Sequence, residues 1–88
     1  MSSADSLLEF PCDFPLKVMG IAAGDFDQLV LAIVRRHVAG LDPAAVRATP
    51  SRQGKYVSLT VTVRAESQAQ LDGLYSELSG HERVLMVL

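Results

Sequence analysis

The sequence predicts an α+β fold whose elements follow the order strand, helix, strand, strand, helix, strand. Residues 26–37 and 71–78 repeat apolar side chains every three or four positions, which is typical of amphipathic helices. Between them, residues 46–65 form two strand-like runs around a glycine-containing turn, which indicates a β-hairpin. Short apolar runs at residues 16–22 and 83–88 supply the first and last strands.

The first strand runs into a turn that contains Gly24 and Asp25. Asp25 followed by Gln28 matches a capping box, in which the aspartate accepts hydrogen bonds from the free amides of the first helical turn. Gly40 is expected to end this helix, and Pro43 keeps it from resuming.

The hairpin has arms at residues 46–52 and 55–65, joined at Gly54, which can take the positive φ of a tight turn. Pro50 lacks an amide donor, so the first arm is expected at an edge of the sheet. The second arm alternates apolar and polar side chains, so one of its faces is expected in the core and the other uncovered.

The second helix is expected to begin with a capping box, Ser67 with Gln70, and to end at Gly80. Gly73, in its middle, is expected to face solvent or to permit a close contact. Right-handed crossovers place both helices on one face of a four-stranded antiparallel sheet with strand order 4-1-3-2. This is the ferredoxin-like βαββαβ sandwich, with the second and fourth strands at its edges.

A chain of 88 residues with 49% apolar side chains is expected to form one domain with one core. We divide it into a flexible lead, residues 1–10, and a domain, residues 11–88. The sequence contains neither an uninterrupted apolar run of about 18 residues nor the basic start and apolar middle of an export signal. We therefore expect a cytoplasmic protein that does not bind membranes.

Cysteine and histidine are too few and too scattered for a metal centre. Cys12 is the single cysteine, which excludes an internal disulfide and any cluster that needs several thiolates from this chain. His37 and His81 stand on different predicted elements without carboxylates at ligand spacing. We expect no metal and no cofactor.

The uncovered sheet face is expected to carry apolar side chains from the first and last strands. Such a patch is typical of a contact surface, and we expect a homodimer formed through this face or through the open edge of the last strand. The candidate interface residues are Met19, Ile21, Tyr56, Leu85 and Val87; the opposite setting of each strand exposes Val18 with Leu16, or Val84 with Met86.

Gly20, Gly24 and Asp25 are candidate ligand-binding residues. They bracket the start of the first helix, where free amides and the positive end of the helix dipole can hold a carboxylate or a phosphate. The turn also has a simpler interpretation as a hinge, because Asp25 as a cap competes for the same amides.

A basic patch is a candidate site for an anionic partner. The predicted topology brings the end of the first helix, the start of the second strand and the end of the third strand to one end of the sandwich. The simpler interpretation of the helical residues is that cations offset the negative end of the helix dipole. The patch consists of Arg35, Arg36, His37, Arg47 and Arg64.

Nucleic-acid binding and catalysis are not supported. RNA-recognition motifs share the βαββαβ order, but they are basic and stack bases on aromatic residues of both central strands. Here Tyr56 is the one such aromatic, and the net charge is −2. Acylphosphatase needs an asparagine, and the sequence has none. Without a set of nucleophile, base and orienting group, we expect a protein that is not an enzyme.

Four segments, "LLEFPCDFPLKVMG", "SRQGKYVSLTVTV", "LYSEL" and "RVLMVL", closely resemble the YbeD-like family of small bacterial proteins of uncharacterised function. The resemblance covers residues 7–88 and implies a ferredoxin-like fold similar to the ACT regulatory domain. ACT domains often pair their sheets and bind amino acids between subunits, commonly at the loop after the first strand. Residues 22–25, which form that loop here, lack the proline–glycine pair of many ACT domains.

The function expected from the sequence is that of a non-catalytic, dimeric module that regulates by binding. Its ligand would be an amino acid or another small carboxylate held between subunits. The alternative is an adaptor that binds a protein partner and needs no small ligand.

Overall fold

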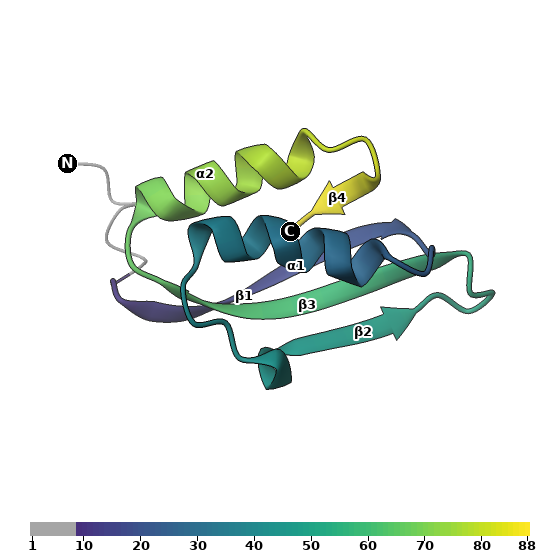
Figure 1. The fold of residues 1–88 in the computed structure, drawn as a ribbon, viewed down its shortest axis with the longest axis horizontal. Helices are drawn as coiled ribbons and strands as arrows, with labels where there is room; N and C mark the ends of the chain where they lie inside the picture. Colours follow the sequence, from purple (N-terminus) through teal and green to yellow (C-terminus); the bar gives the residue numbers. More distant parts are fainter. Residues whose placement is uncertain (1–8) are drawn as a thin grey trace.

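A four-stranded antiparallel sheet forms one layer of the structure, a computed structural model that describes residues 9–88. Its strands lie in the order β2-β3-β1-β4, which confirms the predicted topology and places β2 and β4 at the edges (Figure 1). The central strands pair over their whole length, from Cys12 with Ala65 to Ile21 with Tyr56. The strands are β1 (Cys12–Ile21), β2 (Val46–Pro50), β3 (Tyr56–Ala65) and β4 (Val84–Val87).

Two helices, α1 (Phe26–His37) and α2 (Gln68–Ser79), lie on the same side of this sheet (Figure 1). A short 3₁₀ helix, η2 (Pro43–Ala45), leads into β2. The helices turn their apolar stripes toward the inner faces of β1 and β3, and burial of these side chains is the main contribution to stability. The largest fully buried side chains are Phe26, Leu16, Leu59, Leu71, Leu74, Leu78, Val18, Val30, Val34, Val61 and Val63.

Strand β1 begins at Cys12, four residues before the predicted start at residue 16. Pro15 does not interrupt it, because proline removes only one amide donor. The Lys17 amide donates to the Leu88 carbonyl, so amides at alternate positions of β1 point toward β4. The backbone nitrogen of Pro15 also faces the β4 side, but β1 extends beyond the end of β4 at this residue. The missing amide donor therefore costs no hydrogen bond between the strands.

The pairing of β4 with β1 contains a bulge that the sequence did not predict. Met19 pairs with Met86, but Gly20 pairs with Val84, so Leu85 is an extra residue. As a result Leu85 and Met86 are both exposed, and neither alternating pattern expected for this strand is correct. Val87, expected on the open face, is instead partly buried against the core.

The start of α1 corrects a second expectation. Asp25 occupies the N-cap position, but its carboxylate is directed to the guanidinium of Arg83 rather than to the helix amides. The Gln28 amide donates to the carboxylate of Asp27. The predicted cap of α2 is confirmed, because Ser67 Oγ accepts from the Gln70 amide at 3.1 Å.

Two glycine predictions are confirmed. Gly54 has a φ of 72° in the hairpin turn, and Gly40 has a φ of 67° just after α1, which ends at His37. Gly73 faces His37 of the other helix, but a Cβ atom there would lie 3.4 Å from Cε1 of His37, an ordinary contact that does not require glycine. The predicted lead, residues 1–10, falls mostly outside the described residues, and Phe10 packs against the core.

Candidate functional site

The outer face of the sheet is the candidate interaction surface, because the two helices cover only the inner face (Figure 1). One end of this face is apolar. Met19 pairs across the strands with Met86, and Ile21 pairs with Tyr56. Ile21 is 56% exposed and Met86 49%, and Leu85 beside them is 54% exposed. We call Met19, Ile21, Tyr56, Leu85 and Met86 the apolar end.

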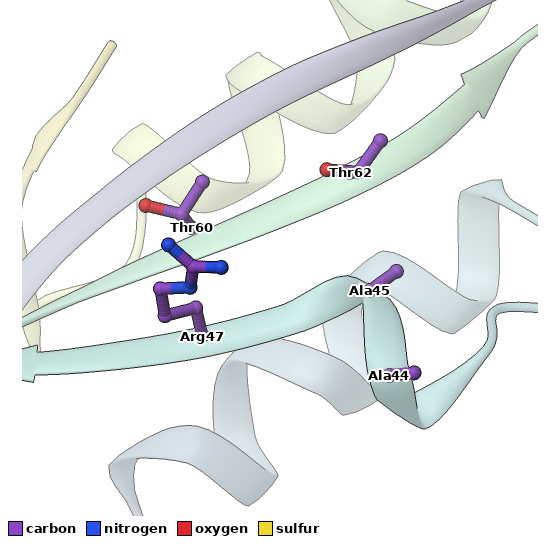
Figure 2. Close-up of a pocket in the computed structure, with 5 residues that line it drawn as sticks. All are labelled: Ala44, Ala45, Arg47, Thr60 and Thr62. Carbon is purple, nitrogen blue, oxygen red and sulfur yellow. The ribbon is translucent and has the colours of Figure 1, made fainter.

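The middle of the same face carries basic side chains. Lys17 on β1 pairs with Thr60 on β3, and Thr60 pairs on its other side with Arg47 on β2. These three residues, which we call the cation row, therefore cross three adjacent strands in register, and their side chains point outward because β3 buries the alternate positions. Figure 2 shows Arg47 extending from β2 toward Thr60.

Two shallow hollows lie beside the cation row. The first, of about 300 Å³, is lined by Ala44, Ala45, Arg47, Thr60 and Thr62 (Figure 2). The second, of about 330 Å³, shares Ala45 and Thr62 with it and extends to Arg64 and to the segment after α1. The two hollows therefore adjoin each other along β3.

The candidate ligand-binding residues at the start of α1 have roles within the fold itself. Gly20 lies under the ring of Phe26, and a Cβ atom at this position would approach the Arg83 carbonyl oxygen to 2.7 Å. The Asp25 carboxylate accepts two hydrogen bonds from Arg83, at 2.8 and 3.1 Å. Gly24 lies in the turn between them. This arrangement favours the interpretation of the turn as a hinge.

The ion pair also changes the acidity of its two members. Hydrogen bonding from Arg83 is the main cause that holds the pKa of Asp25 below its ordinary value. The same contact raises the pKa of Arg83. Asp25 is therefore a charged group that is already engaged by a cation.

The structure does not bring the five residues of the predicted basic patch together. Arg36 and His37 contact the carboxylate of Glu77 on α2, with His37 Nε2 2.7 Å from Oε1 of Glu77. Arg64 donates to Asp13 at 3.2 Å. Arg35 is exposed on α1, and Arg47 belongs to the cation row on the other side of the sheet.

Lys17 was not among the predicted site residues. Its outward direction follows from the alternation of β1, but its place in a row with Arg47 depends on the register of β1 on β3 and of β3 on β2. Periodicity within one strand determines which face each residue takes, but it does not distinguish registers between strands that differ by two residues. The sequence signal was therefore insufficient to find the cation row.

The described part of the chain offers neither a cluster of metal ligands nor a membrane-spanning helix. Across residues 9–88, no three side chains among His, Cys, Asp and Glu gather where they could hold a metal ion. Within the same residues, no helix is both long and apolar enough to cross a membrane.

The strand order, the two helices on one face and the open opposite face define a ferredoxin-like α+β protein. Two solved structures are similar to it in fold. Protein HP0495 from H. pylori matches with a TM-score of 0.75 at 12% identity, covering 92% of this chain and 85% of its own. The ACT domain from GTP pyrophosphokinase of Chlorobium tepidum matches with a TM-score of 0.64 at 10% identity, covering 86% and 84%. The fold is therefore ACT-like.

The chain belongs to the family described as "Protein of unknown function (DUF493)", whose model matches residues 5–88. A UPF0250 protein of Paraburkholderia phytofirmans is 47% identical over 89 residues, covering all of both chains. A UPF0250 protein of Bordetella pertussis is 49% identical over 84 residues, covering 96% of this chain and 92% of the relative. The resemblance seen in the sequence is thereby confirmed.

Proposed function

We propose that this protein is a non-catalytic regulatory module that acts in the cytoplasm as a homodimer. The observation that carries this proposal is the apolar end of the open sheet face. Ile21, Leu85 and Met86 expose about half of their surface to solvent, and Tyr56 stands directly across from Ile21. Contiguous exposed apolar side chains of this kind mark surfaces that bind other molecules.

A second copy of the chain is the proposed occupant of this surface. Strand β4 lies at an edge of the sheet, so one side of its backbone is free for pairing in the described structure. The exposed Leu85 and Met86 lie on that same strand. Packing of two copies through the face would cover the apolar side chains, and association through the edge would pair the free side of β4. In both cases a small domain gains stability from the added buried area.

The regulatory part of the proposal rests on the ACT-like fold and on the side chains that the site contains. The solved ACT domain with this fold comes from GTP pyrophosphokinase. The open face of the described sheet carries apolar side chains, threonines, the Asp13–Arg64 pair and the cations Lys17 and Arg47, without a nucleophile held by a base and an orienting group. A small carboxylate or amino acid held between subunits would be the regulatory signal.

The first test is a change of oligomeric state. We expect Ile21→Glu to convert a dimer into a monomer, raising the dissociation constant by about tenfold or more, because a carboxylate would be buried against Tyr56 and Met86. Sedimentation velocity measures the mass. Ala32→Glu, an exposed position on α1, is the matched control and should stay dimeric. A monomeric parent chain, or a dimeric Ile21→Glu, would remove the proposed interface.

The ligand is tested separately by thermal denaturation in the presence of amino acids and small carboxylates. A compound that binds the native dimer must raise the unfolding temperature, and the stabilising free energy grows with the logarithm of its concentration relative to its dissociation constant. The adaptor without a small ligand remains the competing function. It predicts an unchanged unfolding temperature with every compound at saturating concentration.

A further inference from the structure

We propose that the cation row, Lys17, Thr60 and Arg47, docks an acidic segment of a partner protein. The row runs perpendicular to the strands, one residue from each of β1, β3 and β2. Neighbouring strands lie about 4.8 Å apart, so the two cationic residues stand about 10 Å apart at their Cα atoms with a hydroxyl between them. The proposal goes beyond self-association, which uses the apolar end of the same face.

The charges of this row are available for a partner. The four ion pairs of the described residues engage Arg36, His37, Arg64 and Arg83, and none of them includes Lys17 or Arg47. Asp13, the acidic residue of β1, forms an ion pair with Arg64 and therefore does not neutralise Lys17. The second hollow is lined in part by the acidic residues Asp13 and Asp42, and Asp42 accepts from the Ala44 amide. The first hollow has no acidic residue in its described lining, so the positive charge of Arg47 is not offset there.

Charge is divided unevenly between two parts of the described chain. Strands β1 to β3 with the hairpin turn contain five basic residues and one acidic residue. The rest of the described chain, residues 9–11, 22–45 and 66–88, contains three basic and eight acidic residues. The net charge of −2 therefore conceals a basic part, made of three strands and the hairpin turn, and an acidic part, made of the helices, the connecting segments and the two ends of the described chain. Such a field attracts and orients an acidic partner toward the sheet.

An acidic protein segment fits the row better than a single small anion. Lys17 and Arg47 are exposed, and one ion pair between exposed groups contributes little to affinity. A segment with several carboxylates makes several such contacts at once. In an extended chain, carboxylates two residues apart lie about 7 Å from each other, within reach of two long side chains that start about 10 Å apart.

Nucleic acid fits the row less well, because single strands bind by stacking their bases on aromatic side chains. The side chains that flank the row on the described sheet face are Pro15, Thr62, Met19, Ser58 and Thr49, none of them aromatic. The acidic residues outside β1 to β3 would also repel a polyanion that extends beyond the sheet.

The test uses the full-length chain and a synthetic peptide of alternating glutamate and serine. Titration is followed by amide NMR and by fluorescence anisotropy of the labelled peptide at low salt. We expect chemical-shift changes at Lys17, Thr60 and Arg47, and weaker binding as salt rises. Arg47→Glu should raise the dissociation constant by about tenfold or more, and Arg47→Gln by less. Lys55→Glu, which reverses a charge on the hairpin turn, is the matched control.

Several outcomes would overturn the proposal. These are unchanged peptide affinity in Arg47→Glu, equal losses in Arg47→Glu and Lys55→Glu, and shift changes confined to the hairpin turn. Tighter binding of oligouridine or of phosphatidylglycerol vesicles than of the peptide would assign the row to RNA or to a lipid surface. Sedimentation and peptide titration of both variants distinguish this proposal from the proposed dimer. Arg47→Glu should remain dimeric, and Ile21→Glu should still bind the peptide.

Discussion

Gly20 shows how one residue without a side chain fixes the packing of two elements. It lies in β1 directly beneath Phe26, the first residue of α1, whose side chain is fully buried. A Cβ atom at this position would meet the Phe26 ring and the carbonyl oxygen of Arg83. The absence of a Cβ lets the helix lie close to the sheet, and the same position marks the bulge between β1 and β4.

The first prediction at this scale compares two glycines four residues apart. Gly20→Ala should lower the free energy of unfolding by about 1–3 kcal/mol, because the added methyl group would overpack the contact with Phe26. Gly24→Ala should change it by less than about 0.5 kcal/mol, since a Cβ there has open space around it in the described structure. Urea denaturation measures both values, and equal effects would contradict this account of Gly20.

At the scale of the element, the two helices are stabilised at their starts in different ways. Helix α2 has a local cap, in which Ser67 Oγ accepts from the Gln70 amide, and the Gln70 side chain accepts from the Glu66 amide at 2.6 Å. The same glutamine side chain donates to the carbonyl of His37 at the end of α1. One residue therefore closes the start of α2 and ties it to the neighbouring helix.

Replacement of the cap serine tests this arrangement. Ser67→Ala should cost about 1 kcal/mol of unfolding free energy, because the Gln70 amide loses its acceptor. The matched control is Ser76→Ala, the same substitution at an exposed position inside α2, where alanine is the better helix former and stability should not fall. Equal losses at the two positions, measured by denaturant unfolding, would show that the cap hydrogen bond is unimportant.

At the scale of the whole molecule, distant parts of the chain are joined by charge as well as by the core. Arg83, just before β4, binds Asp25, just before α1, across 58 positions in sequence. Glu77 on α2 likewise binds Arg36 and His37 at the end of α1. These contacts join the two helices and hold the segment before β4, while Lys17 and Arg47 form no ion pair among the described residues.

The Asp25–Arg83 pair predicts a dependence of stability on pH. The pKa of Asp25 is lowered in the folded protein, so the pair stabilises the fold above the unfolded pKa of about 4 and the contribution disappears as pH falls through the lowered value. Asp25→Asn should therefore unfold at a lower temperature than the parent protein at pH 7, and the difference should shrink below about pH 4. Calorimetry over this pH range checks it, and a constant difference would refute the role of charge.

The sequence specified the local elements and their order well. Alternation in residues 55–65 located the inner and outer faces of β3, and three-to-four spacing located the buried stripe of α1, because burial imposes these periods within one element. The start of β1 was placed too late, since the effect of Pro15 depends on whether a neighbouring strand needs its amide. The role of Asp25 was misjudged because its partner lies far away in sequence.

By itself, the sequence determined the βαββαβ order, the side of β3 that is buried and the family to which the chain belongs. Only the tertiary structure decided the bulge that exposes both Leu85 and Met86, the capture of Asp25 by Arg83 and the alignment of Lys17 with Arg47. The physical reason is that side-chain periodicity records burial within one segment. Register between strands and the choice of ion-pair partner are fixed by the packing of the whole molecule.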